Sequence, residues 1–226
     1  MMKKDYNFCP KNLIPAFHGK QKISPDPKVE NAMALHYKEN LSLEEISDLL
    51  SEFINGISFY KQTMRRICLK ALVRNIGDSV TISQGVIFKH PETFSIGNGV
   101  FIGDNCLLQG RHDGTAIIEE GSWIGPQVFL DARNLHIGKN VGIGPSVRIL
   151  GSQHTGLPSN VPVIQTDLEI KPVIIEDNTD IGTGVTILPG VRVGKGSIIG
   201  AGAVVKKDVP AMSIAVGVPA KVIRKR

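Results

Sequence analysis

The segment from Ile175 to Val205 reads IEDNTDIGTGVTILPGVRVGKGSIIGAGAVV and carries an aliphatic residue at every sixth position. An α-helix spaces apolar residues about 3.6 apart and a half-buried strand about 2 apart, so neither explains a strict period of six. Short strands joined by tight corners do explain it. Glycine follows several of the anchors, where the backbone must turn or pass close to a neighbour. The anchors of this segment are Ile175, Ile181, Ile187, Val193, Ile199 and Val205.

The same period extends back to Ile76. Four residues after most anchors lies a small or β-branched residue, which implies a second inward position. Extra residues follow Phe88, Leu108, Leu130 and Ile149, always after the third anchor of a triplet. Three hexapeptides therefore make one turn of a triangular prism, and insertions project from one corner. The earlier anchors are Ile76, Ile82, Phe88, Ile96, Ile102, Leu108, Ile118, Ile124, Leu130, Ile137, Ile143 and Ile149.

These patterns predict an all-β fold, a parallel β-helix of about six coils over residues 76–211, with a long loop at about 150–173. Residues 1–75 are expected to form a mainly helical N-terminal segment, and residues 212–226 a basic C-terminal tail. A capping box at Ser42-Leu43-Glu44-Glu45 predicts a helix to about Phe53, and a second helix is expected from about Ser58 to Arg74.

The second predicted helix has an apolar and a basic side. Its apolar side is expected to cover the open first coil and its basic side to face solvent. The expected apolar residues are Phe59, Ile67, Leu69, Leu72 and Val73, and the expected solvent-facing residues are Arg65, Arg66, Lys70 and Arg74.

Composition restricts the cellular setting. Cys9, Cys68 and Cys106 are odd in number and scattered, so neither a disulfide framework nor a zinc-type spacing is present. Charged and polar residues interrupt the stretch from Met1 to Lys20, and no run approaches the roughly 18 apolar residues of a membrane helix. We therefore expect a cytoplasmic protein without integral membrane association. We expect no nucleic acid partner either.

The segment IGTGVTILPGVRVGKGSIIGAGAVVKKDVPAMSIAVGVPAKVIRKR, from Ile181 to Arg226, resembles the C-terminal half of the sugar and polysaccharide O-acetyltransferases. These are hexapeptide-repeat acyltransferases, and the resemblance covers about residues 76–226. It implies a left-handed coil, whereas the general rule for parallel crossovers would give the right hand. It also implies acetyl-coenzyme A as acyl donor, no metal, and a homotrimer with active sites between subunits.

His154 is the candidate general base. It stands on the long corner loop just after the fourth coil, and a histidine can take a proton from an attacking hydroxyl or amine and return it to the leaving thiolate. In the family the catalytic histidine has this setting, before a loop ending Pro-x-x-Ile, here Pro172 to Ile175. Asp131 begins the corner one coil earlier, where the resemblance implies contact with the sugar or the base. A corner-turn aspartate is the alternative.

The basic end of the chain is the candidate coenzyme A site. By motif match, the resemblance implies that Gly200, Ala201 and Gly202 line the pantetheine arm. It implies that Lys206, Lys207, Lys221 and Arg224 meet phosphates, with a solvated basic tail as the alternative. One departure concerns Asp180, because many relatives carry Trp at this position before Ile181 and Gly182. That departure puts a simple-sugar acceptor in doubt.

The function predicted is acetyl transfer from acetyl-coenzyme A to a sugar hydroxyl or to the amine of a nucleotide-linked amino sugar. Direct transfer is expected, because no recognisable nucleophile motif accompanies His154. Two rival hypotheses stay open. His90, His112, His136 and His154, expected at one prism corner, would hold zinc in a carbonic anhydrase-like enzyme of the same fold. A non-enzymatic β-helical scaffold would bind no coenzyme A.

Overall fold

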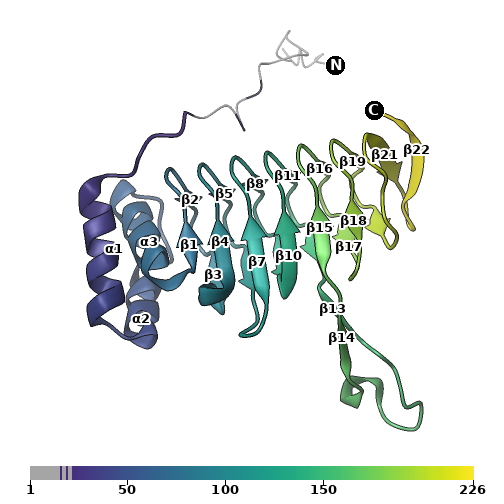
Figure 1. Ribbon diagram of the computed structural model, residues 1–226, viewed down its shortest axis with the longest axis horizontal. Helices are drawn as coiled ribbons and strands as arrows, with labels where there is room; N and C mark the ends of the chain where they lie inside the picture. Colours follow the sequence, from purple (N-terminus) through teal and green to yellow (C-terminus); the bar gives the residue numbers. More distant parts are fainter. Residues whose placement is uncertain (1–15, 17–18, 20–21) are drawn as a thin grey trace, which may run out of the picture.

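The computed structural model describes Ala16, Gly19 and residues 22–226. These residues form a helical cap followed by a long prism of stacked short strands, with an arm projecting from one edge (Figure 1). Cys9 and the other residues of the first fifteen lie outside the described residues, so the expectations placed on them are not addressed. In the described part, no helix is both long and apolar enough to cross a bilayer.

Three sheets form the sides of the prism, and consecutive strands of the chain belong to successive sheets. Sheet A contains β1 (Asn75–Ile76), β4 (Phe94–Ile96), β7 (Thr115–Ile118), β10 (Asn134–Ile137), β15 (Val173–Ile175) and β18 (Arg192–Val193). Sheet B contains β2 (Thr81–Ile82), β5 (Phe101–Ile102), β8 (Trp123–Ile124), β11 (Gly142–Ile143), β16 (Asp180–Ile181), β19 (Ile198–Ile199), β21 (Ser213–Val216) and β22 (Lys221–Lys225). Sheet C contains β3 (Ile87–Lys89), β6 (Leu107–Gln109), β9 (Phe129–Asp131), β12 (Arg148–Ile149), β17 (Thr186–Ile187) and β20 (Val204–Val205).

The three edges of the prism are named by the sheets they join: A/B, B/C and C/A. Strands of one sheet pair in parallel, one coil above the next, so that each anchor faces the equivalent anchor of the neighbouring coil. In sheet B, for example, Ile124, Ile143 and Ile181 align and are fully buried. The predicted parallel β-helix is confirmed, with six complete coils and the start of a seventh at β21.

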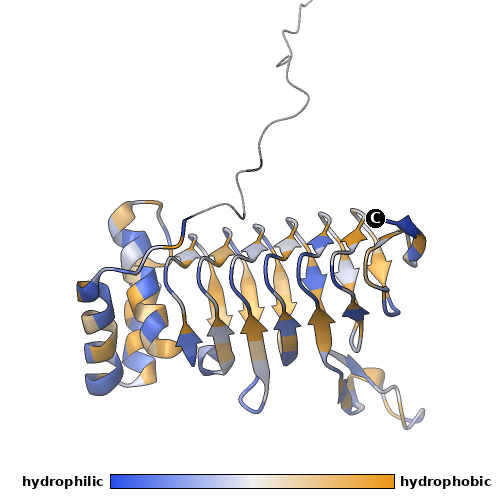
Figure 2. Cartoon of the chain, turned by 45° about the horizontal axis from the view of Figure 1, so that its top comes forward, coloured by the Kyte–Doolittle hydropathy of each residue, from blue (hydrophilic) through white to orange (hydrophobic). Residues whose placement is uncertain are grey.

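The interior of the prism is filled by the two predicted inward positions of each hexapeptide. Buried anchors alternate with the small or β-branched residues four positions later, such as Val141, Val147 and Val185. Figure 2 shows apolar residues on most prism strands, whereas the N-terminal helices carry both apolar and polar residues along their length. This core is mainly aliphatic, and Phe94 in β4 is its fully buried aromatic residue in the described part of the chain.

The helical cap comprises α1 (Lys28–Asn40), α2 (Leu43–Phe53) and α3 (Phe59–Leu72) and lies at the β1 end of the prism (Figure 1). The capping box is confirmed: the Ser42 side chain accepts from the Glu45 backbone N–H, and the Glu45 carboxylate accepts from the Ser42 N–H at 2.8 Å. Helix α1 was not predicted. It begins at Pro27 without a side-chain cap and has only a weak apolar face, so its sequence carries no clear start signal.

The prediction that Arg65 faces solvent is wrong. Its side chain is buried, and its guanidinium donates to the carbonyl oxygens of Ile82 at 3.0 Å, Phe53 at 2.7 Å and Gly56 at 3.0 Å. The first coil has no preceding coil whose N–H groups could donate to its carbonyls, and the end of α2 leaves carbonyls without helical partners. A guanidinium has five donors in a fixed fork, so it can satisfy three carbonyls at once.

Three further side chains of α3 depart from the predicted amphipathic pattern. Lys70, expected to face solvent, has a side chain that is only 9% exposed and forms an ion pair with Asp26 at 2.9 Å. Phe59, expected to cover the first coil, is 81% exposed. Arg66 faces α1, where it forms a bidentate ion pair with Glu30, with both hydrogen bonds 2.7 Å long. The helix therefore packs against α1 as well as against the prism.

The C-terminal segment, expected to be a basic tail, is built into the prism. Strand β21 adds to sheet B in parallel with β19, and β22 returns antiparallel beside β21. The basic residues of this end therefore have fixed positions on an edge strand.

Candidate functional site

The long corner loop is an arm that leaves edge C/A between β12 and β15. Its strands β13 (Ser152–His154) and β14 (Leu168–Ile170) pair antiparallel in a two-stranded sheet of their own, with His154 opposite Leu168. A 3-10 helix at Val163–Gln165 lies near the tip. The arm projects away from the prism in Figure 1, so His154 stands off the prism surface.

The His154 ring is exposed, and one of its nitrogens is held by the arm itself. Its Nδ1 lies 3.0 Å from the carbonyl oxygen of Thr166. Because a carbonyl can only accept, Nδ1 carries the hydrogen in the neutral ring and Nε2 keeps its lone pair. Thr166 is buried, and its hydroxyl donates to the Val163 carbonyl at 2.6 Å and accepts from the Gly156 N–H at 3.1 Å. The arm thus sets both the tautomer and the orientation of the histidine.

Asp131, the predicted acidic site residue, lies at the end of β9, and only 8% of its side chain is exposed. Its Oδ1 accepts from Arg133 Nε at 2.8 Å. Its Oδ2 accepts from the Ser152 hydroxyl at 2.8 Å and from the Gly151 N–H at 3.3 Å. The carboxylate therefore contacts the base of the arm that carries His154.

The glycine-rich corner expected to line the pantetheine arm lies at edge B/C, directly after β19. Gly202 has a φ of +69°, and a Cβ placed on it would meet nothing within 4 Å. Gly184, one coil earlier at the same edge, has a φ of +68° and the same open surroundings. This edge therefore presents bare, exposed backbone that an extended ligand could approach closely.

The basic residues expected to meet phosphates are all exposed but do not form one cluster. The segment before Lys221 runs beside β20, because the Ala220 N–H donates to the Val204 carbonyl at 2.8 Å; this places Lys221 near edge B/C. Arg224 lies opposite Ile214, further along β22 toward edge A/B. Lys206 and Lys207 follow β20 at edge C/A, the edge from which the arm leaves. Sheet C lies between edges B/C and C/A.

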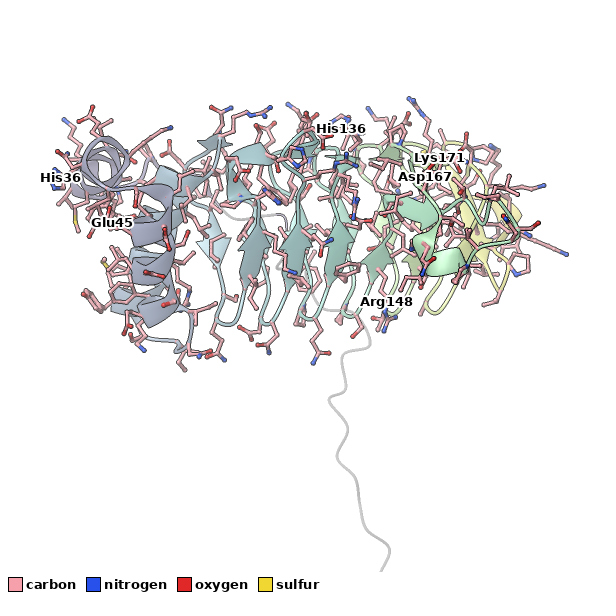
Figure 3. All side chains as sticks on the ribbon, turned by 90° about the horizontal axis from the view of Figure 1, so that it is seen from below. His36, Glu45, His136, Arg148, Asp167 and Lys171 are labelled. Carbon is pink, nitrogen blue, oxygen red and sulfur yellow. The ribbon has the colours of Figure 1, made fainter. Side chains whose placement is uncertain are left out.

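The histidine column expected at one corner is only partly formed. The rings of His90 and His112 lie 6.1 Å apart at edge C/A, but His136 lies within β10 on the outer side of sheet A, where its Nε2 contacts Glu119 Oε1 at 2.6 Å. The prediction for His136 is wrong because this residue directly precedes the inward-facing anchor Ile137 in strand β10, so its side chain points outward from sheet A and not from the corner. Figure 3 shows His136, which belongs to sheet A, on the opposite side of the prism from Arg148, which belongs to sheet C.

The described residues give no support to the zinc hypothesis. Across residues 22–226, no group of three or more His, Cys, Asp or Glu side chains is arranged to hold a metal ion. Cys68 and Cys106 are buried, and burial raises the pKa of each thiol to about 11. At neutral pH neither is a thiolate, so neither is placed to act as a metal ligand or a nucleophile.

Asp180, which replaces the expected aromatic residue, is exposed on the outer side of sheet B. In the same column, two coils earlier, stands Trp123, and its ring is stacked on that of Phe101 with centroids 5.8 Å apart and planes 5° apart. The aromatic surface on this side of the prism therefore lies nearer the helical cap than the resemblance implied.

Three site features were missed by sequence reasoning: the Thr166 carbonyl, the Ser152 hydroxyl and the Arg133 guanidinium. The first is a backbone group and leaves no trace in the sequence. Ser152 and Arg133 were visible as polar residues beside His154 and Asp131, and only the fold shows that they meet. Their positions within two residues of a candidate are the signal that the sequence offers for them.

Comparisons with known proteins match this architecture. Residues 172–207 match the family described as Bacterial transferase hexapeptide (six repeats). The galactoside O-acetyltransferase of Lactococcus lactis is 36% identical over 135 residues, which cover 55% of this chain and 62% of that protein. The chain spans less than two thirds of the length of the first curated relatives it matches.

Two solved structures share the fold over most of their length. A maltose O-acetyltransferase from Clostridium difficile 630 has a TM-score of 0.57 and 26% identity, covering 88% of this chain and 89% of that one. A point mutant of AntD, an N-acyltransferase from Bacillus cereus in complex with dTDP-4-amino-4,6-dideoxyglucose and coenzyme A, has a TM-score of 0.61 and 26% identity, covering 70% and 86%. The chain is thus a hexapeptide-repeat β-helix protein. Its predicted resemblance to the acyltransferases of that class is confirmed.

Proposed function

We propose that the protein is an acetyltransferase that moves an acetyl group from acetyl-coenzyme A directly onto a small acceptor, with His154 as general base. The observation that carries this proposal is the contact of His154 Nδ1 with the Thr166 carbonyl at 3.0 Å, which leaves the Nε2 lone pair for a substrate proton. The similarity to O-acetyl and N-acyl transferases supports the reaction class.

The proposed chemistry is one transfer in a ternary complex. The acceptor oxygen or nitrogen attacks the thioester carbonyl carbon while His154 Nε2 takes the acceptor proton. The carbon–sulfur bond then breaks, and the imidazolium returns the proton to the leaving thiolate. The products are the acetylated acceptor and free coenzyme A. The high pKa values of Cys68 and Cys106 argue against an acyl-enzyme on either residue.

The proposed coenzyme A site combines the corner Gly200, Ala201 and Gly202 with basic residues; Gly202 is open to a ligand, whereas Gly200 lies against Val216. The bare edge suits the pantetheine arm, and Lys221, held beside β20, suits a phosphate. Within residues 22–226, neither Lys206 nor Lys207 forms an ion pair. The neighbouring Asp208 carboxylate accepts from the Arg192 N–H at 2.8 Å. Arg224 lies on the part of β22 that is farther from edge B/C. We assign it to the phosphates as the contact most distant from the glycine corner.

The proposed assembly is a homotrimer in which the arm packs on a neighbouring subunit. The arm carries four large apolar side chains without cover in the single chain, and burying them would favour association. His154 also projects away from its own prism, so a second subunit would supply the opposite wall of the site. The exposed side chains are Leu157 (68%), Val163 (61%), Ile164 (80%) and Leu168 (45%).

The acceptor proposed first is a sugar hydroxyl, which fits the similarity to galactoside and maltose O-acetyltransferases. The amine of a nucleotide-linked amino sugar is the second candidate, favoured by the likeness to AntD with its bound dTDP-amino sugar. The free, buried thiols of Cys68 and Cys106 fit a reducing cytoplasm as the place of the reaction.

An acceptor panel tests the proposal. Thiol release from acetyl-coenzyme A is followed with simple glycosides, oligosaccharides and nucleotide-linked amino sugars, with His154→Ala as the matched control. Release above the control with one class identifies the acceptor, and release with none, together with no coenzyme A binding by calorimetry, would favour the scaffold hypothesis. Intact mass after acetyl-coenzyme A alone should show no acetyl adduct.

A further inference from the structure

We propose that Asp131 is a positioning residue that fixes the angle of the arm, and through it the place of His154, rather than a substrate contact. The proposal rests on the proposed function for the role of His154. Its first support is burial: 8% of the Asp131 side chain is exposed, which leaves little surface for an incoming sugar. A carboxylate is buried at a cost unless its oxygens are well bonded.

The second support is the set of donors that the Asp131 carboxylate has. Ser152 Oγ lies 2.8 Å and the Gly151 N–H 3.3 Å from Oδ2, while Arg133 Nε lies 2.8 Å from Oδ1. Two of these three donors belong to the first residues of the arm. Hydrogen bonds to an ionised acceptor are stronger than those between neutral groups, so the carboxylate holds the arm at its base.

The third support is the direction of the strand. Ser152 and His154 are two residues apart on β13, so their side chains point to the same side of the strand, about 7 Å apart along it. Any tilt of β13 at Ser152 therefore moves the His154 ring directly. The other strand of the arm is tied to the same place, because the Lys171 N–H donates to the Gly151 carbonyl at 3.0 Å.

Gly151 shows how closely the base of the arm approaches the third coil. A Cβ at this position would lie 2.5 Å from the Asp131 carbonyl oxygen, so a larger residue would push the arm away. Backbone and side chain of Asp131 both meet the same arm residue. The arm is thus fitted to the prism at its base, and Asp131 lies at the centre of this contact.

The experiment compares Ser152→Ala and Asp131→Asn with Ser152→Thr, which keeps the hydroxyl. Loss of alignment should lower kcat by about 10- to 100-fold for the first two variants, because a base displaced by about 1 Å loses that much rate. The KM for the acceptor should stay within about twofold, because binding contacts are untouched. Ser152→Thr should restore most of the rate. The double variant should lose about as much as either single one, because both changes break the same contact.

Hydrogen exchange gives a readout that does not depend on activity. Amides of residues 152–170 should exchange faster in Ser152→Ala and Asp131→Asn, while those of the prism strands stay protected as in the wild type. A raised acceptor KM with unchanged kcat, or unchanged exchange in the arm, would overturn the proposal. If Asp131→Asn fails to fold, Ser152→Ala decides alone. If His154→Ala stays active, the proposed function fails, and the exchange result still judges the clamp.

Discussion

The prism and the arm are built on opposite principles. In the prism, each buried residue repeats the environment of the residue one coil earlier, as Ile143 repeats Ile124, so one sequence period determines all six coils. In the arm, no position repeats: His154, Thr166 and Ser152 each make a contact found once in the described residues. The comparison indicates that stability is distributed over the repeat, whereas the proposed chemistry is concentrated where the repeat is interrupted.

Removing the arm is the strongest test of this division. Residues 152–170 can be replaced by two glycines, because Gly151 and Lys171 are already joined by a hydrogen bond at the base of the arm. We expect no detectable acetyl transfer but an intact prism, since no core residue is removed. Circular dichroism and thermal melting would measure the prism, and thiol release the activity. An unfolded product would show that the arm contributes to folding.

Replacing His154 by alanine narrows the test to one side chain. Loss of a positioned general base costs about 10²–10⁴-fold, and the loss should fall on kcat because the proton moves in the transition state. Oligomeric state by light scattering and coenzyme A affinity by calorimetry should match the wild type. If more than about half of the activity survives, another base acts. His112 would then be examined first and His136, despite its place on sheet A, second.

A pair of apolar substitutions compares the two regions by stability alone. Ile143→Ala in the fully buried prism core should lower the free energy of unfolding by about 2–5 kcal/mol. Leu168→Ala, at a side chain that is 45% exposed on the arm, should change the free energy of unfolding of the single chain by no more than about 0.5 kcal/mol. Urea unfolding of both variants, at a protein concentration low enough to dissociate the proposed trimer, makes the measurement. Similar losses in the two variants under these conditions would mean that the arm also packs within the single chain.

The smallest effect is expected at the basic end of the prism. Lys221→Ala should raise the KM for acetyl-coenzyme A by about tenfold, since a hydrogen bond to a charged group contributes that much, with a smaller change in kcat. Arg224→Ala should have the same sign and a smaller size, because Arg224 lies further along β22 from edge B/C. Lys38→Ala, an exposed lysine of α1, is the control. If the three variants had the same KM for acetyl-coenzyme A, the residues of β22 would not bind its phosphates.

The repeat made the prism predictable, because every inward residue had to be apolar and of similar size. The sequence could not show where Arg65 points, since a basic residue on an amphipathic helix faces solvent unless carbonyls without partners lie beneath it. It could not show the clamp at Asp131 either, because Ser152 lies 21 residues away. His154 was found through its corner position and its resemblance, but its tautomer depends on a backbone oxygen that only the fold brings near.

The two ends of the prism bear on its solubility. Parallel strands stacked in register are also the arrangement of an amyloid fibril, and an uncovered last coil would offer free backbone groups to the next molecule. Arg65 and the helical cap cover one end. At the other, β22 turns back antiparallel and presents the sequence Lys-Val-Ile-Arg-Lys, whose charges discourage further pairing. A chain ending at Gly217 would expose β21, and we expect it to polymerise end to end, which thioflavin fluorescence and electron microscopy would detect.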